Sequence, residues 1–327
     1  MDWPFNGVKN GKKYGTKCST VPKNAEKIKI KPNQHRLNQL AHLALTPALK
    51  AQLQQWLNED LGRGDLSAAA LIACDGKAHW LAKQAGVFCG GSLAEAIFNC
   101  LDPNLKIKLL VNDGEAVTPG QRLLELEGSA IAMVAGERTA LNLAMHLSGI
   151  ATATAVLVTE LEGTGVRLAD TRKTTPGLRI LEKYASRCGG AINHRLGLDD
   201  AAMLKENHLA WAGGIETAVA AVRAHAPWPA KIIVEAETEA EATAAIAAGA
   251  DAVLLDEFSP EALQLLVPKL RNQASNRGNP VLLEASGIKP EQLHAYACSG
   301  IDLISTSAAC TRNNWLDLSM RFHTDKG

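Results

Sequence analysis

Three groups of cationic side chains lie close together in the second half of the chain, each where a predicted strand ends. They are Arg172-Lys173, His194-Arg195 and Lys205. Arginine binds planar carboxylates through two parallel hydrogen bonds, and lysine supplies a compact point charge. A solvated surface would scatter such charges without regard to strand ends. The pattern therefore predicts a pocket for an anion that carries several charges.

Carboxylates and small residues follow the next three predicted strands. They are Glu235 and Glu237, then Asp256 and Glu257, and finally Glu284 with Ser286-Gly287. Paired carboxylates suit Mg²⁺ that is also bound by substrate phosphates, and they could instead hold sugar hydroxyls or an oxocarbenium-like centre. Cations beside carboxylates indicate a substrate that has carboxylates of its own and a metal-bound phosphate.

Each of these residues, taken alone, has a structural alternative. Arg172-Lys173 could be solvated loop charges, and His194 could be a structural histidine with satisfied hydrogen bonds. Glu235 could be half of an ion pair at the mouth of a barrel, and Ser286-Gly287 is by itself a weak phosphate signal. The joint placement at consecutive strand ends favours a functional site, because independent surface charges would rarely align in this way.

The elements that must position these residues are repeated strand–helix units, which predict a parallel sheet. Seven strand candidates occur at 166–170, 190–194, 201–205, 231–236, 252–256, 281–286 and 301–306. Several of them end in a polar residue, which favours a closed barrel with its active site at the carboxyl ends of the strands. The predicted fold class is α/β, an N-terminal α/β sandwich followed by a TIM-like α/β barrel of about seven strands.

The first half of the chain predicts a separate domain. Thr46-Pro47 is a helix start, with threonine as the cap and proline at the first helical position, and Gly62 ends that helix. Strand patterns fill 78–128, and a helical stretch from Gly136 is expected to be interrupted at Ser148-Gly149. The predicted organisation has four parts: a basic, flexible extension at 1–35, a sandwich domain at 36–147, a catalytic barrel at 148–310, and a C-terminal tail at 311–327 that packs back on the N-terminal domain.

The composition excludes several classes of protein. With 34 basic and 34 acidic residues the net charge is zero, so no nucleic-acid or membrane partner is expected. The seven cysteines form no C-x-x-C pair, which argues against a zinc ribbon or a redox pair. No apolar run approaches the length of a membrane span, and the N-terminus has no apolar signal core. We expect a soluble cytoplasmic protein, whose lysine-rich extension could alternatively bind an acidic partner.

Ten stretches between about residues 37 and 322 resemble the quinolinate phosphoribosyltransferase family, which has the type II phosphoribosyltransferase fold. They are Glu59–Ser67, Gly86–Gly90, Gly136–Asn142, Leu147–Thr152, Asp170–Gly177, Asn193–Leu198, Lys205–His208, Leu254–Asp256, Leu283–Gly287 and Leu316–Phe322. The sequences Thr-Arg-Lys-Thr-Thr-Pro-Gly and Asn-His-Arg-Leu-Gly-Leu in this set are close to diagnostic of the family.

The resemblance implies that quinolinate and phosphoribosyl pyrophosphate give nicotinate mononucleotide, pyrophosphate and CO₂ with Mg²⁺, in a homodimer with shared active sites. Arg138 would reach into the neighbouring subunit's site, and Lys173, Glu235 and Asp256 would be catalytic. The quinolinate carboxylates would be surrounded by Arg172, Lys173, His194, Arg195 and Lys205. Glu235 and Asp256 would face the ribose and the metal-bound pyrophosphate, directly or through water. The 5′-phosphate would lie on Ser286, Gly287 and Ser307.

Two positions depart from the family pattern. Ser307 replaces a usual glycine and could crowd a phosphate or donate to it, and Glu257 replaces a usual asparagine and adds a negative charge near the pyrophosphate. Two alternatives to the implied enzyme remain. One is transfer to another aromatic acid, against which the intact set of Arg138, Arg172, Arg195 and Lys205 argues. The other, which Ser307 and Glu257 motivate, is a non-catalytic anion-binding paralogue of the same fold.

Overall fold

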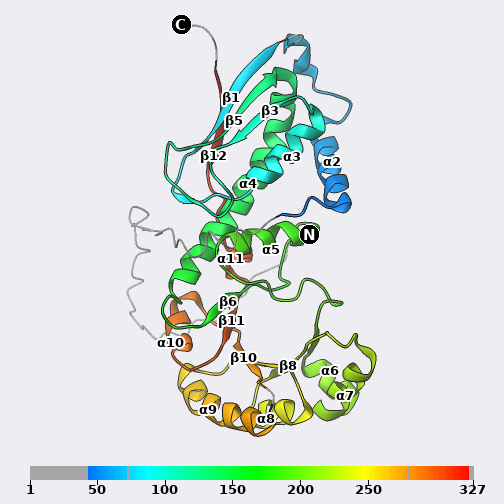
Figure 1. The fold of residues 1–327 in the computed structure, drawn as a ribbon, viewed down its shortest axis with the longest axis vertical. Helices are drawn as coiled ribbons and strands as arrows, with labels where there is room; N and C mark the ends of the chain where they lie inside the picture. The colour runs from blue at the N-terminus through cyan, green and yellow to red at the C-terminus, as the bar shows by residue number, and fades with distance from the viewer. Residues whose placement is uncertain (1–42, 72–73, 279, 324–327) are drawn as a thin grey trace, which may run out of the picture.

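The computed structural model describes residues 43–71, 74–278 and 280–323. The predicted extension at 1–35 lies outside these residues. Figure 1 shows an antiparallel sheet with its helices at one end of the molecule and a parallel sheet with its helices at the other. The long helix α4 runs from the first toward the second. This arrangement confirms the predicted α/β fold class.

The first described helix, α2 (Pro47–Leu61), begins and ends as its sequence predicts. The Thr46 hydroxyl accepts a hydrogen bond from the Leu49 amide at 3.2 Å, which satisfies one of the unpaired amides at the helix start. Gly62 ends the helix with φ 52°, a left-handed conformation that glycine adopts at little cost. Leu53 and Leu57 lie on the buried face and fix the helix against the core.

The N-terminal domain is built on an antiparallel sheet in the order β12-β1-β5-β3. Its strands are β1 (Asp75–Ala82), β3 (Lys106–Leu109), β5 (Arg122–Ser129) and β12 (Leu318–His323). The last strand comes from the end of the chain, and Met320 lies opposite Trp80 of β1. Trp80 is fully buried and contacts the ring edge of Phe98 in α3 (Gly91–Leu101). Smaller elements complete the domain: η1 (Leu66–Leu71), β2 (Gly86–Val87) and β4 (Ala116–Val117).

Helix α4 (Ala130–Thr159) is continuous, so the interruption expected at Ser148-Gly149 is wrong. These two small residues serve close packing. The Ser148 hydroxyl donates to the Cys89 carbonyl at 3.0 Å, and a Cβ on Gly149 would lie 2.3 Å from the Asn314 carbonyl oxygen. Within the described ranges, α4 alone has the length and hydropathy to cross a membrane. Because 56% of its most apolar window is buried inside the protein, these properties fit a core helix.

The second half of the chain forms a six-stranded parallel sheet in the order β6-β11-β10-β9-β8-β7. Its strands are β6 (Arg167–Ala169), β7 (Ala202–Leu204), β8 (Ile232–Ala236), β9 (Ala252–Leu255), β10 (Leu282–Ala285) and β11 (Leu303–Ser305). The helices between and after them are α5 (Arg179–Cys188), α6 (Glu206–Ala212), α7 (Ile215–His225), α8 (Glu239–Ala248), α9 (Pro260–Asn276), η2 (Pro290–Gln292), α10 (Leu293–Ala297) and α11 (Ala308–Thr311). Figure 1 shows α6 to α10 on the outside of this sheet.

The second predicted strand, at 190–194, is not a strand of this sheet and contributes only a single parallel bridge between Ile192 and Ala169. The next amides are bonded to side chains and not to a neighbouring strand. The His194 amide donates to Asp170 Oδ1, and the Arg195 amide donates to His194 Nδ1, both at 2.7 Å. Because these amides are taken, the segment makes no ladder with β7.

Candidate active site

A cavity of about 770 Å³ at the carboxyl ends of the parallel strands collects all but one of the predicted site residues. Those that line it are Arg172, Lys173, His194, Arg195, Lys205, Glu235, Asp256, Ser286, Gly287 and Ser307. Arg138 is the exception, because it lies exposed on α4 and does not line this cavity. Its predicted role lies across a subunit interface, so it stays a prediction.

The strand order explains how the charges are distributed around the cavity. Among the inner strands, β8 carries Glu235, while Asp256 directly follows β9 and Ser286 directly follows β10. The cations follow the two edges of the sheet, with Arg172 after β6 and Lys205 after β7. Because both edges contribute to one cavity, the sheet curves enough to bring its cationic ends together with the carboxylates between them.

The cationic end concentrates positive charge before any substrate binds. Burial, followed by repulsion from Arg172, lowers the pKa of Arg195 below the usual value of a guanidinium. The Arg195 side chain is held by a hydrogen bond to the Ala201 carbonyl at 2.9 Å. Two guanidinium groups that repel each other in a half-buried site form a strong binding point for a carboxylate.

His194 is oriented by protein groups on both ring nitrogens. Nδ1 accepts the Arg195 amide, so in the neutral ring Nε2 carries the proton and faces Glu284 Oε2 at 3.3 Å. Glu284 is 1% exposed, and its other oxygen, Oε1, is buried without a hydrogen-bond partner in the structure. The imidazole therefore lines the cavity as an oriented ring, while Glu284 is a buried carboxylate beneath the cations.

The carboxylate side of the cavity is already bonded to neighbouring side chains. Glu235 forms an ion pair with Lys205, and the Ser286 hydroxyl donates to Asp256 Oδ1. Desolvation and then the nearby carboxylates, Glu206 first, raise the pKa of Glu237 above its usual value. Acidic side chains therefore gather on this side of the cavity, away from Arg172 and Arg195.

The two departures from the family pattern differ in their backbone geometry. Glu257 has φ 58° and is the one non-glycine residue with positive φ among the described residues. Asparagine tolerates this left-handed conformation far better than glutamate. Ser307 has φ −93°, so its backbone does not require glycine. Gly287 does adopt a left-handed conformation, with φ 73°, and lies close to Asp256.

Sequence reasoning missed several residues that line the cavity. Lys289 and Arg312 lie in the lining with Ser286 and Ser307, and they add positive charge to a region where the sequence offered only hydroxyls and Glu257. Lys289 follows Gly287 closely and could have been identified from that spacing. Arg312 falls within the predicted C-terminal tail at 311–327, and the short helix α11 (Ala308–Thr311) connects it to Ser307.

Comparisons with known proteins agree over both halves of the chain. A family model described as "Quinolinate phosphoribosyl transferase, N-terminal domain" matches residues 65–148, and one described as "Quinolinate phosphoribosyl transferase, C-terminal domain" matches residues 150–321. The probable nicotinate-nucleotide pyrophosphorylase [carboxylating] of Synechocystis is 46% identical over 272 residues, 82% of this chain and 90% of the relative. The human nicotinate-nucleotide pyrophosphorylase [carboxylating] is 39% identical over 86% of this chain and 94% of its own length.

A solved structure gives the same result at the level of the fold. The crystal structure of NadC from Streptococcus pyogenes superposes with a TM-score of 0.80 and 36% identity, covering 86% of this chain and 98% of that chain. The family models, the sequence relatives and the structural neighbour all cover the antiparallel domain and the parallel sheet together. This chain belongs to the quinolinate phosphoribosyltransferase family.

Proposed function

We propose that this chain transfers the phosphoribosyl group of phosphoribosyl pyrophosphate to quinolinate, with decarboxylation, in NAD biosynthesis. The products are nicotinate mononucleotide, pyrophosphate and CO₂. The observation that carries this proposal is the division of one cavity into a cationic end around Arg172 and Arg195 and a carboxylate side at Glu235 and Asp256. An acceptor with two carboxylates and a donor that develops positive charge on its sugar need that division.

The cationic end would bind the acceptor. Arg172, Lys173, Arg195 and Lys205 would hold the two carboxylates of quinolinate, and His194 would lie against the ring as an oriented neighbour. Fixing a planar dicarboxylate in this way aims the pyridine nitrogen toward the carboxylate side of the cavity. Such orientation lowers the barrier because the reacting atoms meet without further loss of freedom.

The carboxylate side would stabilise the sugar as it reacts. The pyridine nitrogen attacks the anomeric carbon while pyrophosphate leaves, so positive charge builds on the ribose. Preorganised carboxylates at Glu235 and Asp256 would stabilise that charge, and Lys205 would be available to the substrate carboxylate once Glu235 turns to the sugar. Removal of one such preorganised group typically costs about 10²–10³ in rate.

Decarboxylation would follow from the new bond. When the carboxylate on C2 leaves as CO₂, the electron pair of the broken bond stays on C2, where the adjacent positive pyridinium nitrogen stabilises it as an ylide. A proton from solvent then binds to this pair at C2. The cations that hold the second carboxylate keep the ring oriented through this step.

The donor set fits Mg²⁺ that arrives with the substrate. Across the described ranges no group of three or more histidine, cysteine or acidic side chains could hold a metal ion alone. Mg²⁺ is commonly bound by one or two carboxylates together with substrate phosphates, which Glu235 and Asp256 could supply directly or through water. When bound, the ion would neutralise charge on the leaving pyrophosphate.

The 5′-phosphate of the donor would lie at the other end of the cavity. Ser286, Gly287 and Ser307 would offer hydroxyl and backbone donors there. The positive charges of Lys289 and Arg312 support this assignment, because they offset the added carboxylate of Glu257.

We also propose a cytoplasmic homodimer in which Arg138 completes the partner's site. Arg138 is exposed on α4 and is available to a second copy of the chain. The cytoplasmic assignment is supported by Cys89, Cys188 and Cys298, which are free thiols as expected in a reducing compartment.

A product assay tests the proposed reaction. Purified protein would be mixed with quinolinate, phosphoribosyl pyrophosphate and Mg²⁺, and nicotinate mononucleotide would be quantified by chromatography with mass detection. We expect nicotinate mononucleotide, pyrophosphate and CO₂ in equal amounts. No product above a heat-inactivated control would overturn the proposal, and quinolinate binding by calorimetry without turnover would identify the non-catalytic alternative.

A further inference from the structure

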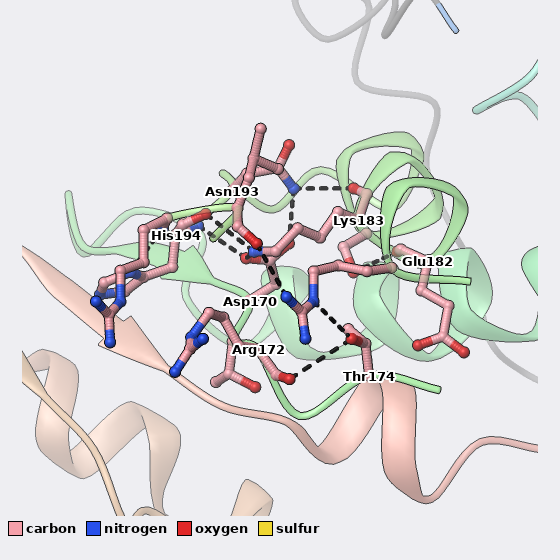
Figure 2. A network of polar contacts seen from close by, with 12 residues as sticks. Asp170, Arg172, Thr174, Glu182, Lys183, Asn193 and His194 are labelled. Carbon is pink, nitrogen blue, oxygen red and sulfur yellow. Dashed lines mark hydrogen bonds and ion pairs between the residues drawn. The ribbon is translucent and has the colours of Figure 1, made fainter. Parts of the chain in front are cut away.

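A buried polar network lies beneath the cationic end and joins the two loops that carry its cations (Figure 2). It is formed by Asp170 at the end of β6, Lys183 in α5, and Asn193 and His194 in the second loop. Asp170 is 4% exposed and Lys183 is 1% exposed, and neither lines the cavity. A buried lysine outside the site is rare enough to need a reason.

The hydrogen bonds of this network form a closed set. Lys183 Nζ contacts Asp170 Oδ1 at 2.5 Å and donates to the His194 carbonyl at 2.9 Å. The His194 amide donates to the same Asp170 oxygen at 2.7 Å. The Asn193 amide group donates to Asp170 Oδ2 at 2.6 Å and to the Lys183 carbonyl at 2.9 Å. Arg172 follows Asp170 by two residues and Arg195 follows His194 by one, so the network fixes the backbone from which both guanidiniums extend.

Helix α5 makes further contacts with these loops through Arg179 and Glu182. Arg179 is three residues before Glu182 and four before Lys183, so it is a neighbour of both on the helix surface. Glu182 Oε2 accepts the Thr175 amide at 3.0 Å and anchors the end of the first loop. Arg179 donates to the Thr174 hydroxyl at 3.1 Å and to the Leu196 carbonyl at 3.3 Å, so it spans both loops. In Figure 2, Glu182, Lys183 and Thr174 lie to one side of Asp170, and His194 lies to the other.

Burying this ion pair is costly. Desolvation raises the pKa of Asp170 above its usual value, although Lys183, Asn193 and the His194 amide all act in the opposite direction. Apolar side chains of similar volume often replace a buried pair without loss of stability, so stability alone is a weak reason for it. The bonds of the pair to two loops point to a geometric role.

We propose that Lys183 and Asp170 are positioning residues that set the separation of Arg172 and Arg195. They would thereby tune the site to an acceptor with two carboxylates on adjacent ring carbons. This inference rests on the proposed function and deepens it. A fixed separation matters for a dicarboxylate that binds both cations and matters little for a monocarboxylate that binds one. It also matters little for the phosphoribosyl donor at the other end of the cavity.

Three variants and one control test this role. Lys183→Met removes the ammonium but leaves the Asp170 charge buried, so it could fail to fold. The double variant Asp170→Asn with Lys183→Met removes that charge while methionine still cannot donate to the His194 carbonyl. Asp170→Asn alone keeps the lysine. Lys269→Met is the matched control, because Lys269 forms an exposed pair with Glu239 at 2.7 Å on the helical surface.

The measurements are calorimetric affinities for quinolinate, nicotinate and phosphoribosyl pyrophosphate, together with KM and kcat in the product assay. We expect the folded double variant to bind quinolinate about tenfold or more weakly, since a charge-assisted hydrogen bond lost at one carboxylate corresponds to about that factor. Nicotinate and the phosphoribosyl donor should bind within about twofold of wild type, and Lys269→Met should change nothing.

Two results would overturn the positioning role. One is unchanged quinolinate affinity in the double variant, and the other is an equal loss of affinity for all three ligands. A failure of the proposed function is distinguishable, because it would appear as an inactive wild-type protein. The calorimetric comparison of quinolinate with nicotinate would still decide the positioning role in that case.

Discussion

Glu257 offers the sharpest test of how the backbone and the charge of the cavity interact. It has φ 58°, a left-handed conformation that costs an ordinary L-residue roughly 1–2 kcal/mol. It also lines the cavity beside Asp256, where the resemblance to the family leads us to expect asparagine. Glu257→Asn therefore changes two quantities at once, the backbone strain and the charge.

The magnitudes can be worked out separately. Asparagine bonds locally to its own backbone in the left-handed region, so it should recover part of the strain and raise the free energy of unfolding by about 0.5–1 kcal/mol. Loss of an exposed like charge near the pyrophosphate is worth about 0.5–1 kcal/mol. That energy corresponds to a KM for phosphoribosyl pyrophosphate lower by about two- to fivefold.

Glu257→Gln separates the two effects, because it removes the charge and keeps the strained backbone. We expect both variants to lower the KM for phosphoribosyl pyrophosphate and only Glu257→Asn to gain stability in urea unfolding. A Glu257→Asn protein no more stable than wild type would refute the strain argument. A higher KM in Glu257→Gln would refute the charge argument and indicate instead that Glu257 is a ligand of the metal–pyrophosphate.

Three further outcomes follow from other parts of the structure. Mixing Arg138→Ala with Lys173→Ala protein should restore part of the activity through hybrid sites, and activity no higher than either parent would count against shared sites. Gly149→Ala should lower the free energy of unfolding by about 1–3 kcal/mol, since the new Cβ would lie 2.3 Å from the Asn314 carbonyl oxygen. Gly76→Ala is the control, because its Cβ would lie at an ordinary 3.8 Å from the Ala130 side chain. Burial opposes the charge of Glu182, yet bonds from His146 and Thr175 hold its pKa below its usual value. The ionised Glu182 therefore stabilises the fold above about pH 4.5, and this stabilisation is lost as the pH falls through the lowered pKa. In Glu182→Gln, the free energy of unfolding measured in urea should fall less steeply toward acid pH. The same decrease with pH as in wild type would contradict this reasoning.

The sequence predicted those parts of the site that follow from local patterns. Arg172, Lys205, Glu235 and Asp256 were identified because parallel strands end at a common edge, and all four line one cavity. The cap at Thr46 was predicted for the same kind of reason, since a local hydrogen bond determines where the helix begins. Their roles toward the substrates remain proposals.

What the sequence did not predict depends on contacts between distant segments. Ser148-Gly149 has the composition of a helix break, but packing against Cys89 and Asn314 decides its role within a continuous helix. Lys183 has the sequence context of an ordinary surface helix, and its burial appears only when α5 packs on the two loops. Arg312 lies in the cavity lining with Ser307 because the single turn of α11 connects the two residues.

The central claim is that the two ends of the cavity bind the two halves of the reaction. A crystal structure with quinolinate bound tests it most directly. Both carboxylates should contact the group formed by Arg172, Lys173, Arg195 and Lys205, with the pyridine nitrogen facing Glu235 and Asp256. Carboxylates bound at Lys289 and Arg312, or a nitrogen turned away from the carboxylate side, would contradict the account.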